Sequence, residues 1–220
     1  MPEEISKLVN LRELVLSHNR INHVPEELYL SLTQLQTFLV NNNSIFYSLS
    51  KHISGLVNIV TLSFKSNNLS IIPDTVGQLE KLQDLDFSYN QIQQLPHALS
   101  SLTTLQKLNL QGNVLITIPH WLGNFTQLKV LFLRENSLVE LPTEIGQLQQ
   151  LQLLELGRNQ LTALPAELFQ LTEIVSLNVQ HNHLSSIQSL ANIGQLVNLT
   201  RFCFQDNKAV AIPQVSTTPQ

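Results

Sequence analysis

Residues 128–148 read LKVLFLRENSLVELPTEIGQL, and this stretch decides the fold. Its first half has the form LxxLxLxxN and ends at Asn136, and its second half has the form xLxxLPxxIxxL. The same two-part unit recurs along the chain, and successive units are separated by 24, 24, 23, 23, 23, 23, 23 and 25 residues. The recurring asparagines are Asn19, Asn43, Asn67, Asn90, Asn113, Asn136, Asn159, Asn182 and Asn207. Such a period is typical of stacked repeats.

The composition agrees with a repeat and excludes several other classes. Of 220 residues, 43% are hydrophobic and 13% are charged, about half of the usual ~25%. That excludes a highly charged disordered chain. The net charge of −4 gives no electrostatic footprint for nucleic acid. No run approaches the ~18 apolar residues of a membrane span, and Cys203, the single cysteine, excludes an intrachain disulfide.

The spacing within one unit predicts its geometry. Leu131 and Leu133 are two residues apart, so they point to one face of a short strand. The apolar residues of the second half return the chain across the back, and Pro142 favours an extended segment or a short helical turn there. Asn136 can bond backbone groups of the turn that would otherwise be buried unpaired. Each unit buries its faces only against its neighbours.

These motifs resemble those of leucine-rich repeat proteins. The 23-residue period and the sequence LPTEIGQL at 141–148 are similar to the intracellular class of Ras-associated and Ras-suppressor-type (Shoc-like) repeats, and to bacterial repeat proteins with the same consensus. The resemblance implies an α/β repeat solenoid. It implies a right-handed horseshoe with a concave parallel sheet and short 3-10, helical or extended convex segments. It also implies a platform for protein partners.

The repeat organisation predicts one domain over 1–213, with about nine coils of which the first and last are incomplete, and a polar tail over 214–220. Beginning in mid-repeat is expected of a fragment of a longer protein or of a short product with frayed ends. Leu49 and Gln188 stand where other coils have proline. We expect loop adjustments there, although an irregular convex segment can also mark a partner site.

The outward strand positions contain one apolar group among mostly polar residues. Val130, Phe132 and Leu153 fall at these positions on adjacent coils. Aromatic and aliphatic residues beside arginine are enriched in protein interfaces. The residues predicted to bind a partner are therefore Val130, Phe132, Arg134, Leu153, Glu155 and Arg158. The alternative is scattered surface apolar residues, which most proteins have.

A second candidate surface is charged. It consists of Asp84, Asp86, Tyr89 and Lys107. A solvated charge cluster is the simpler interpretation of this group.

The sequence lacks the motifs of catalysis and cofactor binding. His181 and His183 flank a turn asparagine and do not supply the converging ligands of a metal site. No phosphate-binding glycine loop occurs, and an open sheet lacks the enclosed cavity that most catalysis uses. We therefore expect no enzyme activity, metal or cofactor.

The sequence favours a non-catalytic scaffold that binds a protein partner on the concave face, and the resemblance implies intracellular, small-GTPase-type signalling. The alternative is the recognition arm of a larger receptor, kinase or ubiquitin ligase. We expect a cytoplasmic monomer with no nucleic-acid partner and no membrane span. A secreted sensor is a third, weaker hypothesis, prompted by the Asn-x-Ser/Thr sequons at Asn42, Asn68, Asn124 and Asn198.

Overall fold

The structure, a computed structural model, describes residues 3–185 and 192–208. Within these residues the main element is a nine-stranded parallel sheet with one strand per coil, in the order β1-β2-β4-β6-β7-β8-β9-β10-β11. Its strands are β1 (Glu13–Val15), β2 (Thr37–Leu39), β4 (Thr61–Ser63), β6 (Asp84–Asp86), β7 (Lys107–Asn109), β8 (Val130–Phe132), β9 (Leu153–Glu155), β10 (Ser176–Asn178) and β11 (Arg201–Cys203). We number the coils one to nine by these strands. The expected α/β repeat solenoid is confirmed.

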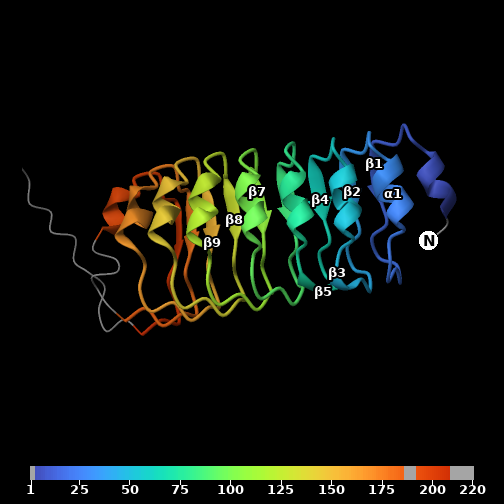
Figure 1. The fold of residues 1–220 in the computed structure, drawn as a ribbon. Coiled ribbons are helices and arrows are strands. Elements are labelled where there is room, and N and C mark those ends of the chain that lie inside the picture. The colour runs from blue at the N-terminus through green and yellow to red at the C-terminus, as the bar shows by residue number, and fades with distance from the viewer. Residues whose placement is uncertain (1–2, 186–191, 209–220) are drawn as a thin grey trace, which may run out of the picture.

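Short helical turns form the opposite side of the solenoid. They are α1 (Glu26–Ser31) and the 3-10 turns η1 (Glu3–Lys7), η2 (Lys51–Gly55), η3 (Asp74–Gln78), η4 (His97–Ser101), η5 (His120–Asn124), η6 (Thr143–Gln147), η7 (Ala166–Gln170) and η9 (Ile193–Gln195). Figure 1 shows them aligned along one side of the stacked coils. Before η3 to η7 stands a proline with φ between −64° and −70° and an extended ψ. Proline therefore ends the extended segment and starts the turn, as its fixed φ predicts.

The core runs without interruption between the sheet and the turns. The central strand residues Leu131 and Leu154 are fully buried, as are the turn residues Ile145 and Leu168. Each fully buried leucine or isoleucine contributes roughly 1.5–3 kcal/mol. In the first four coils aromatic rings form a row through the core, with successive centroids 6.3, 5.7 and 6.2 Å apart. The row consists of Tyr29, Phe38, Phe64 and Phe87.

The recurring asparagines join each coil to the preceding one. Asn136 Nδ2 donates to the carbonyl of Leu110 in coil five at 2.9 Å and to that of Leu133 in its own coil at 3.0 Å. Its Oδ1 accepts the N–H of Leu115 in coil five at 3.1 Å. The equivalent bonds form in coils two to nine, whereas Asn19 in coil one bonds only its own coil. The predicted role of these side chains is confirmed, and the bonds form an asparagine ladder along the solenoid.

The residue before each ladder asparagine has a positive φ. In the described residues these φ values lie between 51° and 66°, and Gly112 is the one glycine among them. The others are His18, Asn42, Ser66, Tyr89, Glu135, Arg158, His181 and Asp206. A left-handed conformation costs an L-residue about 1–2 kcal/mol. The sequence pattern does not reveal this conformation, because glycine stands at this position only once and eight residue types occur there. The adjacent ladder bonds offset the cost.

Coil two corrects one detail of the repeat assignment. Ser50 precedes η2 with φ −62° and ψ 139°, and its hydroxyl accepts the N–H of His52. It therefore takes the structural place of the proline, while Leu49 is buried in the core. The extra residue lies between Asn43 and Ser50, which are seven positions apart where Asn67 and Pro73 are six apart. In this region β3 (Phe46–Ser48) pairs with β5 (Asn68–Ile71), and the register shifts because Tyr47 lies opposite Leu69 and Ser48 opposite Ile71. Gln188 and the predicted tail over 214–220 lie outside the described residues.

Candidate partner-binding surface

The three predicted apolar residues meet on two neighbouring strands. Val130 of β8 lies directly opposite Leu153 of β9, and Phe132 lies opposite Glu155. On the other side, Phe132 faces Asn109 of β7. All three apolar side chains are half-buried, because the adjacent strands cover part of each one. We call Val130, Phe132 and Leu153 the concave patch.

A charged group borders one end of the concave patch. Arg134 Nε lies 3.2 Å from Glu135 Oε1, and Arg158 Nε lies 3.8 Å from the same oxygen. Glu155 Oε2 accepts a hydrogen bond from Asn178 Nδ2 at 2.7 Å. The structure therefore places every residue of the predicted site on coils six and seven. It adds Glu135, which joins the two arginines.

Phe132 interrupts a polar pattern of the sheet. In coils four, five and eight its equivalents are Asp86, Asn109 and Asn178, whose side chains accept the backbone N–H two residues further on. A phenylalanine cannot accept this bond. Within the described residues the backbone N–H of Arg134 consequently has no protein acceptor. The apolar area of the concave patch thus lies beside an unused backbone donor, the N–H of Arg134.

The second candidate surface satisfies most of its own polar groups. Lys107 Nζ lies 3.1 Å from Asp84 Oδ2, and Asp86 accepts bonds from the Ser88 N–H and from Asn109 Nδ2. The Tyr89 hydroxyl accepts a bond from Gln111 at 2.7 Å. Ser88 Oγ is buried without a partner. Asp84, Asp86, Tyr89 and Lys107 do lie together, but as a self-paired cluster they offer a partner less than the concave patch does.

A further apolar pair on the concave sheet was missed by the sequence interpretation. Val15 of β1 lies opposite Leu39 of β2. Val15 is 54% exposed, and Leu39 is half-buried. Both residues occupy the same outward strand position as Phe132, so comparison of that position between coils could have found them. Their surroundings lack the arginine pair of coils six and seven.

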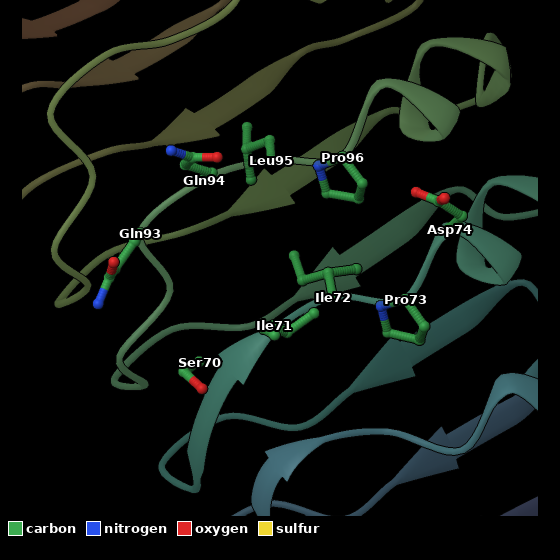
Figure 2. Close-up of a pocket in the computed structure, with 9 residues that line it drawn as sticks. All are labelled: Ser70, Ile71, Ile72, Pro73, Asp74, Gln93, Gln94, Leu95 and Pro96. Atoms are coloured by element: carbon green, nitrogen blue, oxygen red, sulfur yellow. The ribbon is translucent and has the colours of Figure 1, made fainter.

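Two open hollows lie on the flank between the sheet and the turns. The first hollow has a volume of about 570 Å³ and is lined by residues 70–74 on one side and residues 93–96 on the other. Figure 2 shows these two segments side by side, with Pro73 and Pro96 at corresponding ends. The second hollow, of about 740 Å³, is bordered by Val114, Ile116 and Val139, which are exposed. The outward strand positions alone do not reveal this surface, because these residues follow the ladder asparagines.

The described residues contain no group of three or more His, Cys, Asp or Glu side chains that could hold a metal ion. None of the helices in the described part is long and apolar enough to cross a bilayer. A hydrogen bond to Cys203 raises the pKa of Arg201, and the charges of Cys203 and Glu155 add to this shift. These observations give no catalytic constellation on the concave sheet.

Comparison with known families identifies the repeat. A family model described as a leucine-rich repeat region matches residues 1–113 and 119–215, and a second leucine-rich repeat model matches residues 104–125. A leucine-rich repeat protein of Leptospira interrogans is 35% identical, with a TM-score of 0.92. The match covers 97% of this chain and 53% of that protein. The chain thus spans about half the length of that relative.

Two further matches are parts of much longer proteins. The leucine-rich repeat ectodomain of the Arabidopsis thaliana receptor kinase GASSHO1/SCHENGEN3, solved with Casparian strip integrity factor 2, is 32% identical with a TM-score of 0.82. That match covers 94% of this chain and 25% of the receptor chain. An adenylate cyclase of Neurospora crassa is 32% identical over 82 residues, which make up 37% of this chain and 4% of the cyclase.

Proposed function

Since this chain belongs to the leucine-rich repeat family, whose fold serves as a protein–protein interaction module, we propose that it binds a protein partner through the concave patch and the charged residues beside it. The proposed site comprises Val130, Phe132, Arg134, Leu153, Glu155 and Arg158. The proposed binding is non-catalytic, because the sheet is open and lacks the enclosed cavity that most catalysis uses.

The single observation behind this proposal is the register of β8 and β9. Val130 and Leu153 are direct cross-strand neighbours, and Phe132 adds an aromatic side chain on the same face. Interface hot spots are enriched in such clusters, in which an aromatic anchor and aliphatic neighbours lie beside arginine. The pair formed by Val15 and Leu39 has no aromatic residue, so we place the main contact on coils six and seven.

Substitution of the anchor tests the proposal. We expect Phe132→Asp and Leu153→Asp each to abolish partner capture from an extract of the native organism, because a carboxylate would then face the apolar surface of the partner. The circular dichroism spectrum should not change, since both side chains point away from the core. Val139→Asp is the matched control, because it introduces the same charge at an exposed position of coil six. Capture of the same partners by wild type and Phe132→Asp would exclude this site.

A second proposal concerns the context of the chain. The matched receptor and cyclase are several times longer than this chain, which supports a role as the recognition arm of a larger receptor, kinase or ubiquitin ligase. The reading frame upstream and downstream in the genome tests this. A catalytic domain in the same reading frame would support the recognition-arm hypothesis and would contradict the hypothesis of a stand-alone scaffold.

The likeness to Ras-associated repeats supports a further proposal, a role in small-GTPase-type signalling. We also propose a cytoplasmic location, a monomeric state and, from the uninterrupted repeat, a single domain over residues 1–213. Light scattering after size exclusion tests the monomer, and microscopy of a fluorescent fusion tests the location. Entry of the native protein into the secretory pathway would contradict the cytoplasmic proposal.

A further inference from the structure

Three of the four charged side chains beside the concave patch share an unbalanced ion pair, while the fourth, Glu155, is bonded to Asn178. Arg134, Glu135 and Arg158 share one carboxylate between two guanidinium groups, so the three side chains together have a charge of +1. Their exposed fractions are 28%, 35% and 54% respectively. Each guanidinium has five N–H donors, and in the described structure the recorded ion pairs of both arginines use only Nε. The other donors of this group remain for a ligand.

The unused backbone donor lies at the same place. The N–H of Arg134 has no acceptor among the described residues, because Phe132 replaces the aspartate or asparagine that accepts this bond in coils four, five and eight. A carboxylate that reached Arg134 would therefore meet a main-chain donor as well as the guanidinium. Charge-assisted bonds of this kind are roughly twice as strong as neutral ones.

We propose that the concave patch takes an extended peptide segment with an apolar side chain and, two residues away, an aspartate or glutamate. The inference rests on the proposed function and adds the chemistry of the partner. Side chains two residues apart on a strand lie about 6.6–6.8 Å from each other. Arg134 lies two residues beyond Phe132, just past the end of β8, so we expect the apolar side chain to pack on Phe132 while the carboxylate binds Arg134 and Arg158.

A preference for a basic peptide has less support in the structure than a preference for an acidic one. Glu155 is the acidic residue opposite Phe132, and its Oε2 already accepts the Asn178 side chain at 2.7 Å. Glu135 contacts both arginines. A basic peptide would have to displace these partners, whereas an acidic peptide would use donors that are free.

A displayed random peptide library of twelve residues tests the inference. Selection on the wild-type chain is expected to enrich sequences with an apolar residue two positions from an acidic one. A fluorescein-labelled copy of the most enriched peptide is then titrated by anisotropy. We expect the double variant Arg134→Gln, Arg158→Gln to bind it about tenfold more weakly, the effect of one charge-assisted contact. Glu135→Gln should bind it more tightly, because both guanidiniums become free.

The controls separate this inference from the proposed function. Arg20→Gln removes one positive charge from an exposed position on coil one, by the same substitution, and should bind like wild type. Peptides that require Phe132 but contain no acidic residue, and that bind the arginine double variant normally, would overturn the inference and leave the proposed function standing. Peptides that bind Phe132→Asp as well as wild type would overturn both, and a library without enrichment would overturn the inference alone.

Discussion

The concave and convex sides of the solenoid differ in where an extra residue can be accommodated. Coils one and two have 24 residues where the following five have 23, yet their strands pair in unbroken register with those of the other coils. Coil one places its extra residue in α1, which has six residues where η3 to η7 have five. Coil two places it between Asn43 and Ser50, in the segment that contains β3.

This difference shows that the length and register of the strands are constant along the sheet, whereas the segments on the convex side can vary in length. A strand of three residues has no spare position, and a shift by one residue would turn every following side chain to the other face. A convex segment can lengthen a turn or the segment before it without moving the ladder asparagine. Partner-binding residues on the sheet therefore keep their positions while the convex side varies.

The largest expected effect comes from breaking this rule on the concave side. An alanine inserted between Leu131 and Phe132 should turn Leu133 outward and Arg134 inward, and should lower the free energy of unfolding by more than ~3 kcal/mol, since the loss of one buried leucine costs 2–5 kcal/mol. An alanine inserted between Glu140 and Leu141, on the convex side of the same coil, should cost about 1 kcal/mol. Urea unfolding measures both, and equal losses would refute the comparison.

The next effect tests the asparagine ladder. Asn136→Ala removes the acceptor of the buried Leu115 N–H and the donor to Leu110 and Leu133. We expect a loss of about 3 kcal/mol, because each unsatisfied buried group costs roughly 1–3 kcal/mol. Asn19→Ala should cost less than ~1 kcal/mol, since Asn19 is exposed and bonds only its own coil. If thermal unfolding gave equal losses of stability for Asn136→Ala and Asn19→Ala, the bonds between coils would not be a source of stability.

The third effect concerns the left-handed position. Gly112 has a φ of 66°, and an added Cβ would lie 2.5 Å from Tyr89 Cδ1. Gly112→Ala should therefore destabilise the chain by about 1–2 kcal/mol. Ser66→Gly, at the equivalent place in coil three, should change stability by less than ~1 kcal/mol, because the strain that it relieves is offset by the entropy of glycine in the unfolded chain. Denaturant midpoints at constant slope measure both changes.

The smallest effect is expected on the convex side of coil two. Deletion of Tyr47 removes an exposed residue with a φ of 69° and restores the 23-residue length. We expect a change of at most about 1 kcal/mol, in the stabilising direction. A loss above that value would show that the extra residue itself contributes to the fold.

The sequence predicted the parts of the molecule that repeat. The leucine and asparagine spacing located every strand of the sheet, and the outward positions placed Val130 beside Leu153 before the register was known. The sequence could not predict the arginine pair on Glu135, because that contact depends on side-chain rotamers across two coils. Nor could it show that Ser50 replaces proline in coil two. A serine hydroxyl caps the turn by a bond to the His52 N–H, which the proline spacing does not predict.

The asparagine ladder also sets the order in which the molecule can open. Every described coil after the first is tied to its predecessor by side-chain bonds, so the solenoid behaves as a one-dimensional chain of nearest-neighbour contacts. Coil one lacks such a tie on its outer face, and its strand residues Leu14 and Leu16 are only partly buried. Amide hydrogen exchange should be fastest there and slow toward coils six and seven. The concave patch thus lies on coils that the ladder ties to a neighbour on both sides, which favours a surface that is formed before a partner arrives.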